Sequence, residues 1–163
     1  MERRMNIGRQ ETAETAFLRE LALAALEEKA ATMHYTHAAI LAAAEEPAAA
    51  RLFDELARVE LSHYEELGQL LLYLDKAFPP AARGIWHNVF FAKSPHTGQK
   101  KPQDTHVFIK EAITDERKAA ENYRRLADMA TDDVAHKLLL RLSSEEAGHA
   151  TALEGLQERM QNS

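Results

Sequence analysis

Two Glu-x-x-His motifs and two single glutamates are the residues of this chain whose types and spacing suit metal chemistry. In each motif the glutamate and the histidine are three residues apart, so on a helix both side chains lie on one face. Carboxylate oxygens and imidazole nitrogens bind divalent metal ions without distinguishing iron from manganese. Two Glu-x-x-His helices and two single-glutamate helices together supply the ligands of a dinuclear carboxylate site. The predicted metal ligands are Glu28, Glu60, His63, Glu116, Glu146 and His149.

Charge balance favours two divalent ions in such a cluster. A buried carboxylate is costly unless it is paired or binds a metal ion. Four carboxylates contribute −4 and two divalent ions contribute +4, so with neutral imidazoles the net charge of the cluster is close to zero. The competing interpretation is a polar layer in a purely structural bundle. Four glutamates without cations would repel one another, so we favour the metal site.

Proline positions divide the chain into four predicted helices. Pro47 suits the first turn of the second helix, and four further prolines crowd residues 78–104. We expect a single domain over residues 1–163, made of two helical hairpins at about 12–77 and 105–160 and joined by a crossover at 78–104. Within the hairpins, we expect helices over about 12–44, 47–77, 105–130 and 132–160.

Each predicted helix has an inner stripe of mostly apolar residues at alternating spacings of four and three. In chain order the stripes are Phe17, Leu21, Ala24, Glu28, Ala31, Tyr35, Ala38 and Ala42; Leu56, Glu60, His63, Leu67, Leu70 and Leu74; Ile109, Ala112, Glu116, Ala119, Tyr123, Leu126 and Ala130; and Leu139, Leu142, Glu146, His149, Leu153, Leu156 and Met160. This pattern is typical of a left-handed four-helix bundle. A glutamate interrupts every stripe, and a histidine also interrupts two of them. At 1.5 Å per residue, the two glutamates of each hairpin lie at nearly the same height, about 20–24 Å from the turn. All six predicted ligands are therefore expected at the middle of one bundle.

An internal repeat relates the two hairpins. Glu28 is followed by an alanine three residues later and by Tyr35 seven residues later, and Glu116 is followed in the same way by Ala119 and Tyr123. The repeat predicts a pseudo-two-fold arrangement that shares one site. A tyrosine one heptad from each single glutamate can hydrogen-bond a ligating carboxylate. Ordinary core aromatics with local hydroxyl partners are an equally good interpretation of Tyr35 and Tyr123.

The composition agrees with a helical protein and excludes several functional classes. Of the 163 residues, 29 are Ala and 20 are Leu, but only nine are Val or Ile. There is no cysteine, which excludes disulfides, thiolate metal sites and cysteine nucleophiles in this sequence. The net charge of −6 provides no electrostatic footprint for nucleic acid. No apolar run approaches the roughly 20 residues that cross a bilayer, and the first residues lack the apolar region of a secretory signal. We therefore expect a cytoplasmic protein without a membrane partner.

These motifs together resemble the ferritin-like di-iron superfamily, and most closely its rubrerythrin-like (erythrin) branch. The resemblance covers about residues 12–160. It implies a four-helix bundle whose long crossover lets the second and third helices run parallel, a centre of two iron ions, and oxidation of iron by O2 or H2O2. Rubrerythrin carries an appended four-cysteine iron centre that this chain lacks. As aligned, it also has an extra glutamate where this chain has Ala119, and in that branch the glutamate supports redox-linked movement of iron.

Within this resemblance the expected roles of the ligands differ. Glu60 and Glu146 are the expected bridges between two ions, Glu28 and Glu116 are the expected terminal ligands, and each histidine binds one ion. No catalytic residue is predicted beyond the ligands. Turnover then requires an external electron donor such as a rubredoxin. The alternatives are a metal-binding or iron-storage bundle without useful turnover, or a dimanganese catalase. A homodimer is expected, and the run 70–72 exceeds the needs of one apolar stripe; it packs either the crossover or a second subunit.

Overall fold

Four long helices form the described part of the molecule. The structure is a computed structural model that describes residues 12–77 and 104–162, and within these ranges helices are the only regular secondary structure. The helices are α1 (Ala13–Ala42), α2 (Pro47–Ala77), α4 (Thr105–Met129) and α5 (Asp133–Gln161). The all-α fold class is confirmed, and each predicted helix end agrees with the structure to within two residues. The predicted crossover lies outside the described residues except for its last position, 104.

Short polar side chains fix where three of the helices begin. Thr12 accepts a hydrogen bond from the backbone N–H of Thr15, 3.2 Å away, at the start of α1. Asp104 and Asp132 likewise accept backbone N–H bonds at the starts of α4 and α5. A carboxylate at this position satisfies free N–H groups and complements the positive end of the helix dipole. Helix α2 instead begins with Pro47, whose fixed φ angle and missing N–H suit the first helical position.

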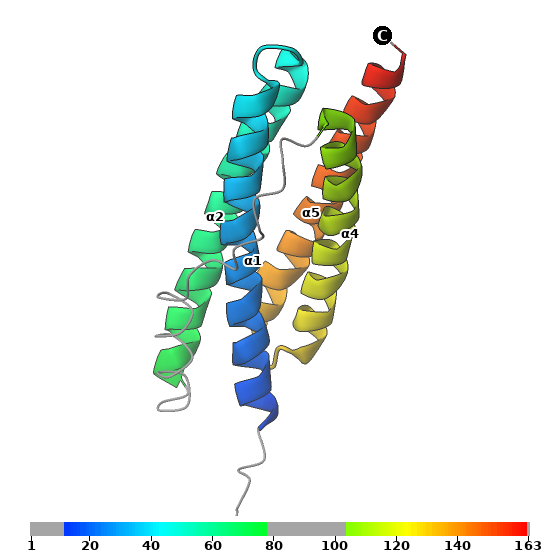
Figure 1. Ribbon diagram of the computed structural model, residues 1–163. Helices are drawn as coiled ribbons and strands as arrows, with labels where there is room; N and C mark the ends of the chain where they lie inside the picture. Colours follow the sequence, from blue (N-terminus) through cyan, green and yellow to red (C-terminus); the bar gives the residue numbers. More distant parts are fainter. Residues whose placement is uncertain (1–11, 78–103, 163) are drawn as a thin grey trace, which may run out of the picture.

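The helices pair as two hairpins lying side by side. Helix α1 packs along α2, and α4 packs along α5, whereas fewer residues meet between the hairpins (Figure 1). The C-terminal halves of α2 and α4 both contribute to the same apolar cluster, together with the N-terminal halves of α1 and α5. Helices α2 and α4 therefore run in the same direction, as the resemblance implied. No described helix is long and apolar enough to cross a membrane.

Two apolar clusters fill the bundle, one toward each end. The first contains Phe17 and Leu21 of α1 with the facing leucines of α2 and α5, and the second contains Phe53, Ile109 and their neighbours. Along α1, the first cluster ends at Ala25 and the second begins at position 35, so Glu28 lies between them. In every helix the glutamate lies between residues of the two clusters, with the order of the clusters reversed in α2 and α4. The polar residues of the inner stripes are consequently held at mid-bundle between two water-excluding layers.

The predicted inner stripes are the buried stripes of the structure, although five of their residues are only half-buried. Half-buried members of the predicted stripes are Ala31, Ala119, Ala130, His149 and Met160. All other predicted members are buried. In the run 70–72, Leu70 and Leu71 belong to the first cluster, whereas Leu72 is 55% exposed. A second subunit at this position remains a prediction.

Candidate metal centre

The structure brings all six predicted ligands together, one or two from each helix. Five of them are buried, and His149 is half-buried. The buried members are Glu28, Glu60, His63, Glu116 and Glu146. They converge because each occupies a position of its helix stripe that would otherwise hold an apolar residue. That they bind metal remains a prediction, which the geometry below supports.

Two overlapping groups of four residues form the centre, and each has one histidine. In each group the potential ligand atoms lie within 4.8 Å of one another. The groups are Glu28, Glu60, His63 and Glu146, and Glu60, Glu116, Glu146 and His149. Glu60 and Glu146 belong to both groups, whereas Glu28 and Glu116 belong to one each. This sharing is what two bridging and two terminal carboxylates require.

Both imidazole rings direct Nδ1 toward the carboxylates. His63 Nδ1 lies 2.8 Å from an oxygen of Glu146 and 3.4 Å from one of Glu60. His149 Nδ1 lies 3.1 Å from the other oxygen of Glu60 and 3.4 Å from Glu116. The two rings are nearly parallel, with an interplanar angle of 16° and centroids 5.6 Å apart. Each histidine therefore presents one nitrogen to its own group of carboxylates.

The two tyrosines of the internal repeat hydrogen-bond the single glutamates. Tyr35 donates its hydroxyl proton to Glu116, and Tyr123 donates to Glu28, so each bond joins one hairpin to the other. Both tyrosines are buried. Burial and the adjacent carboxylates raise the pKa of both hydroxyls far above the usual range, which keeps them protonated as donors. Of the two interpretations of these tyrosines, the carboxylate partner is the one the structure contains.

Without metal, the centre balances its charge with protons. Burial lowers the pKa of both histidines, but the surrounding carboxylates outweigh it and raise the pKa to about 12 for His63 and about 11 for His149. Burial, with help from neighbouring carboxylates, raises the pKa of Glu116 to about 8 and that of Glu28 well above its usual range. Neutral imidazoles are the expectation for the metal-bound cluster. In the metal-free fold both imidazoles are protonated, and their positive charges relieve the carboxylate repulsion.

The shared carboxylates behave in the opposite way. Burial acts to raise the pKa of Glu60 and Glu146, but contacts with His149 and His63 outweigh it, so both pKa values are lowered. Two ionised carboxylates and two imidazolium ions thus face two protonated carboxyl groups, and the net charge of the metal-free cluster is near zero at neutral pH. Replacing four protons by two divalent ions leaves that net charge unchanged.

Unpartnered buried atoms test whether the residues fit a metal ion. Among the described residues, three buried side-chain atoms form no hydrogen bond of good angular geometry: Glu60 Oε1, His63 Nδ1 and Glu146 Oε1. His63 Nδ1 lies 2.8 Å from Glu146 Oε1, and Glu60 Oε1 lies 3.1 Å from His149 Nδ1, so these atoms have charged neighbours but poorly aligned ones. All three belong to the centre and are of the types that bind divalent metal. Leaving a buried polar atom without a well-aligned hydrogen bond is unfavourable, and a cation among these three atoms would satisfy all of them. The donor set therefore fits a metal ion.

One residue of the site, Glu145, is not predicted by the sequence pattern. Glu145 Oε2 lies 2.9 Å from Nε2 of His63, on the outer edge of the ring. Arg141 donates to both oxygens of Glu145 at 2.9 Å, and its other terminal nitrogen contacts Glu66 of α2. Arg141 and Glu145 are four residues apart, which alone indicates only a surface ion pair. No sequence signal points from α5 to the ring of His63 on another helix.

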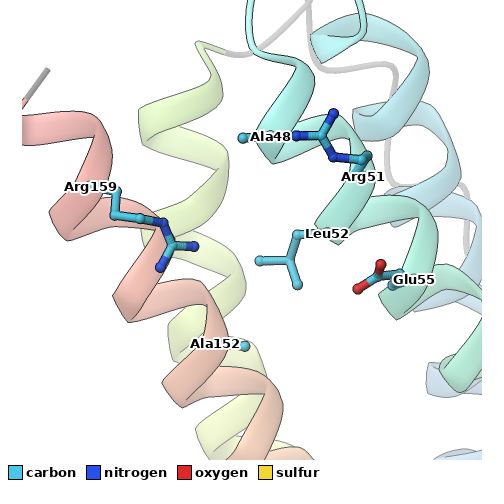
Figure 2. Close-up of a pocket in the computed structure, with 6 residues that line it drawn as sticks. All are labelled: Ala48, Arg51, Leu52, Glu55, Ala152 and Arg159. Atoms are coloured by element: carbon cyan, nitrogen blue, oxygen red, sulfur yellow. The ribbon is translucent and has the colours of Figure 1, made fainter.

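The described part of the molecule also has an open hollow, and none of the six predicted ligands lines it. It has a volume of about 450 Å³ and lies between the N-terminal half of α2 and the C-terminal half of α5 (Figure 2). The lining residues are Ala48, Arg51, Leu52, Glu55, Ala152 and Arg159. The hollow is therefore separate from the buried centre, in which the potential ligand atoms of each group lie within 4.8 Å of one another.

Comparison with known proteins gives a match to one family model. The family model described as the ferritin-like domain matches residues 20–163, which include most of α1, the whole of α2, α4 and α5, and all six predicted ligands. No curated protein and no solved structure matched the chain. The match concerns the ferritin-like family as a whole, and the rubrerythrin-like branch remains a prediction.

Proposed function

The chain belongs to the ferritin-like domain family, and from this we propose that it is a non-haem di-iron oxidoreductase, which oxidises Fe(II) with H2O2 or O2. The observation that carries the proposal is the pair of overlapping ligand groups that share Glu60 and Glu146. A single metal site would need only one such group. Two ions held side by side can together supply two electrons, which is the requirement of peroxide reduction.

The residues of the chain would divide the work of holding two ions. Glu60 and Glu146 would each contact both ions and fix their separation. Tyr35 and Tyr123 would hold the terminal carboxylates in place through their hydroxyl groups. The apolar clusters above and below the centre exclude bulk water, which strengthens the electrostatic interactions inside. Bound iron would supply the electrons for reduction of the oxidant.

Sustained turnover would depend on an external electron donor, and we propose a rubredoxin-like protein in this role. The 163 residues contain no cysteine and hence no thiolate-bound iron centre to return electrons to the buried site. This corresponds to a rubrerythrin-like chain without its rubredoxin-like centre. The donor would have to dock on the outer surface of the bundle, because five of the six predicted ligands are buried inside it.

Metal analysis followed by anaerobic Fe(II) titration tests the proposal. We expect two irons per chain, followed by a rise in near-UV absorbance that depends on added O2 or H2O2. Glu60→Gln, which keeps the size of a shared residue but removes its charge, should abolish the absorbance change. Two irons without an oxidant-dependent change would favour a storage bundle. Manganese in the purified protein with rapid peroxide disproportionation would favour a dimanganese catalase, and binding of neither ion would contradict all three.

A further inference from the structure

The two histidines of the centre have different surroundings on their outer edges. Nε2 of His63 faces the Glu145 carboxylate at 2.9 Å. Glu145 is itself held by Arg141, which also contacts Glu66 on α2. The result is a bridge from α5 to α2 that covers His63, whose side chain is only 1% exposed.

His149 has no comparable support. Its side chain is 13% exposed, and the structure contains no hydrogen bond to its Nε2 from residues 12–77 or 104–162. A departure from the internal repeat explains the difference between the two histidines. Glu145 immediately precedes the Glu-x-x-His motif of α5, whereas Val59 immediately precedes the motif of α2. A valine side chain cannot accept a hydrogen bond.

A carboxylate on the outer nitrogen changes what the inner nitrogen can do. When Nε2 donates its proton to Glu145, the lone pair of Nδ1 remains available to a metal ion, and the ring is held in that orientation. The carboxylate also makes the imidazole a stronger ligand. Loss of such a partner typically lowers metal affinity about 10- to 100-fold. His149 must instead be oriented by its contacts with the ligating carboxylates themselves.

We propose that the two metal positions are unequal, and that Glu145 is a positioning residue that makes the His63 position the tighter one. The inference rests on the proposed dinuclear metal binding and adds the order of filling. The first ion occupies the position formed with His63 and Glu28. The second ion occupies the position formed with His149 and Glu116, and it exchanges more readily.

Titration of the metal-free protein with Co(II) alone tests this order. Co(II) binds the same oxygen and nitrogen ligands, and its visible absorption reports on its coordination. The wild-type chain should bind two ions in two steps whose affinities differ at least about 10-fold. His63→Ala should remove the tighter step, and His149→Ala should remove the weaker one. Removal of the same step by both variants would contradict the assignment.

Variants of the supporting residue test its role directly. Glu145→Ala should weaken the tighter step about 10- to 100-fold and leave the weaker step within about twofold. Glu145→Gln, which retains an acceptor oxygen but no charge, should produce a smaller loss. The matched control is Glu158→Ala, which removes an exposed glutamate from the same helix and should change neither step.

The thermal midpoint of each metal-free variant separates positioning from a merely structural role. Positioning predicts a selective loss of one binding step with little change in that midpoint. Equal weakening of both steps together with a lower midpoint would overturn the inference, as would a wild-type chain with two equal affinities or a Glu145→Ala variant with both steps intact. In these cases the proposed function would stand. A wild-type chain that binds neither Co(II) nor Fe(II) would overturn both.

Discussion

Tyr35 on α1 donates its hydroxyl proton to Glu116 on α4, across the boundary between the two hairpins. The sequence repeat associates Tyr35 with Glu28 of its own helix, but the hydrogen bond goes to the equivalent glutamate of the other half. Tyr123 makes the reciprocal bond to Glu28. Since α1 and α4 share few other contacts, this pair of buried bonds joins the hairpins at the level of the centre.

We predict that Tyr35→Phe and Tyr123→Phe each destabilise the metal-free protein. Removing a hydroxyl leaves a buried carboxyl oxygen without its donor, which should lower the free energy of unfolding by about 1–3 kcal/mol. Urea unfolding in the presence of a chelator measures the change. Tyr73→Phe is the control, because Tyr73 bonds Asp132 at 3.2 Å on the exposed surface, and it should cost less than about 0.5 kcal/mol. Equal losses in all three variants would contradict the assigned role of the buried pair.

The sequence predicted the helices and the residues of the centre for the same physical reason. A glutamate in an apolar stripe, such as Glu28 or Glu146, is conspicuous because a register of four and three fixes which side chains face inward. This local rule says nothing about which residues meet across helices. The exchange of tyrosine partners and the contact of Glu145 with His63 depend on ring orientation and helix rotation, so one sequence could not predict them.

Metal binding at neutral pH should release about four protons for two ions. In the metal-free protein, His63 and His149 carry pKa values of about 12 and 11, and the carboxyls of Glu28 and Glu116 also have raised pKa values. All four groups must lose a proton to become ligands. Apparent metal affinity should therefore rise with pH between about 6 and 8. Calorimetric titration in buffers of different ionisation enthalpy measures the protons released, and release of fewer than two would contradict the charge state described above.

The stability of the metal-free protein should fall as pH rises from 6.5 to 9. The pKa values of His63 and His149 are higher in the folded state than their ordinary 6.5, so folding takes up protons in this range. Their stabilising contribution is complete below pH 6.5 and is lost as pH rises toward 11 and 12. Glu116, whose pKa rises from 4.5 to about 8, acts in the same direction between those values. Thermal unfolding with a chelator at both pH values measures the effect.

The metal-loaded protein is the control for that pH series. The ions replace the protons of the histidines and terminal carboxyls, so the thermal midpoint should be higher with Fe(II) or Mn(II) and should fall less with pH. A metal-free protein that is more stable at pH 9 than at pH 6.5 would contradict the prediction. So would an absence of any rise in midpoint with either ion.

Shared and terminal carboxylates should differ in how many ions their removal costs. Glu60→Gln and Glu146→Gln alter a residue of both ligand groups, whereas Glu28→Gln and Glu116→Gln alter a residue of only one. We expect the first pair of variants to weaken binding of both ions and the second pair to retain one ion per chain. Metal analysis after equilibrium dialysis measures the stoichiometry. The substitutions are matched in size and charge, so one ion retained by all four variants would show that Glu60 and Glu146 are not shared.

We predict that the chain oxidises Fe(II) faster with H2O2 than with O2 but consumes peroxide slowly without a partner. The resemblance to the rubrerythrin-like branch favours peroxide, and the sequence has no cysteine to form an internal electron-donating centre. Ala119, one turn beyond Glu116 and packed against the first apolar cluster, provides no carboxylate that could follow an iron ion between oxidation states. Stopped-flow absorbance ranks the two oxidants, and steady-state peroxide consumption is then followed with and without rubredoxin and its reductase. Faster reaction with O2 would favour a ferroxidase. Rapid peroxide consumption at a rate that does not depend on the donor would favour a catalase, because only disproportionation needs no external electrons.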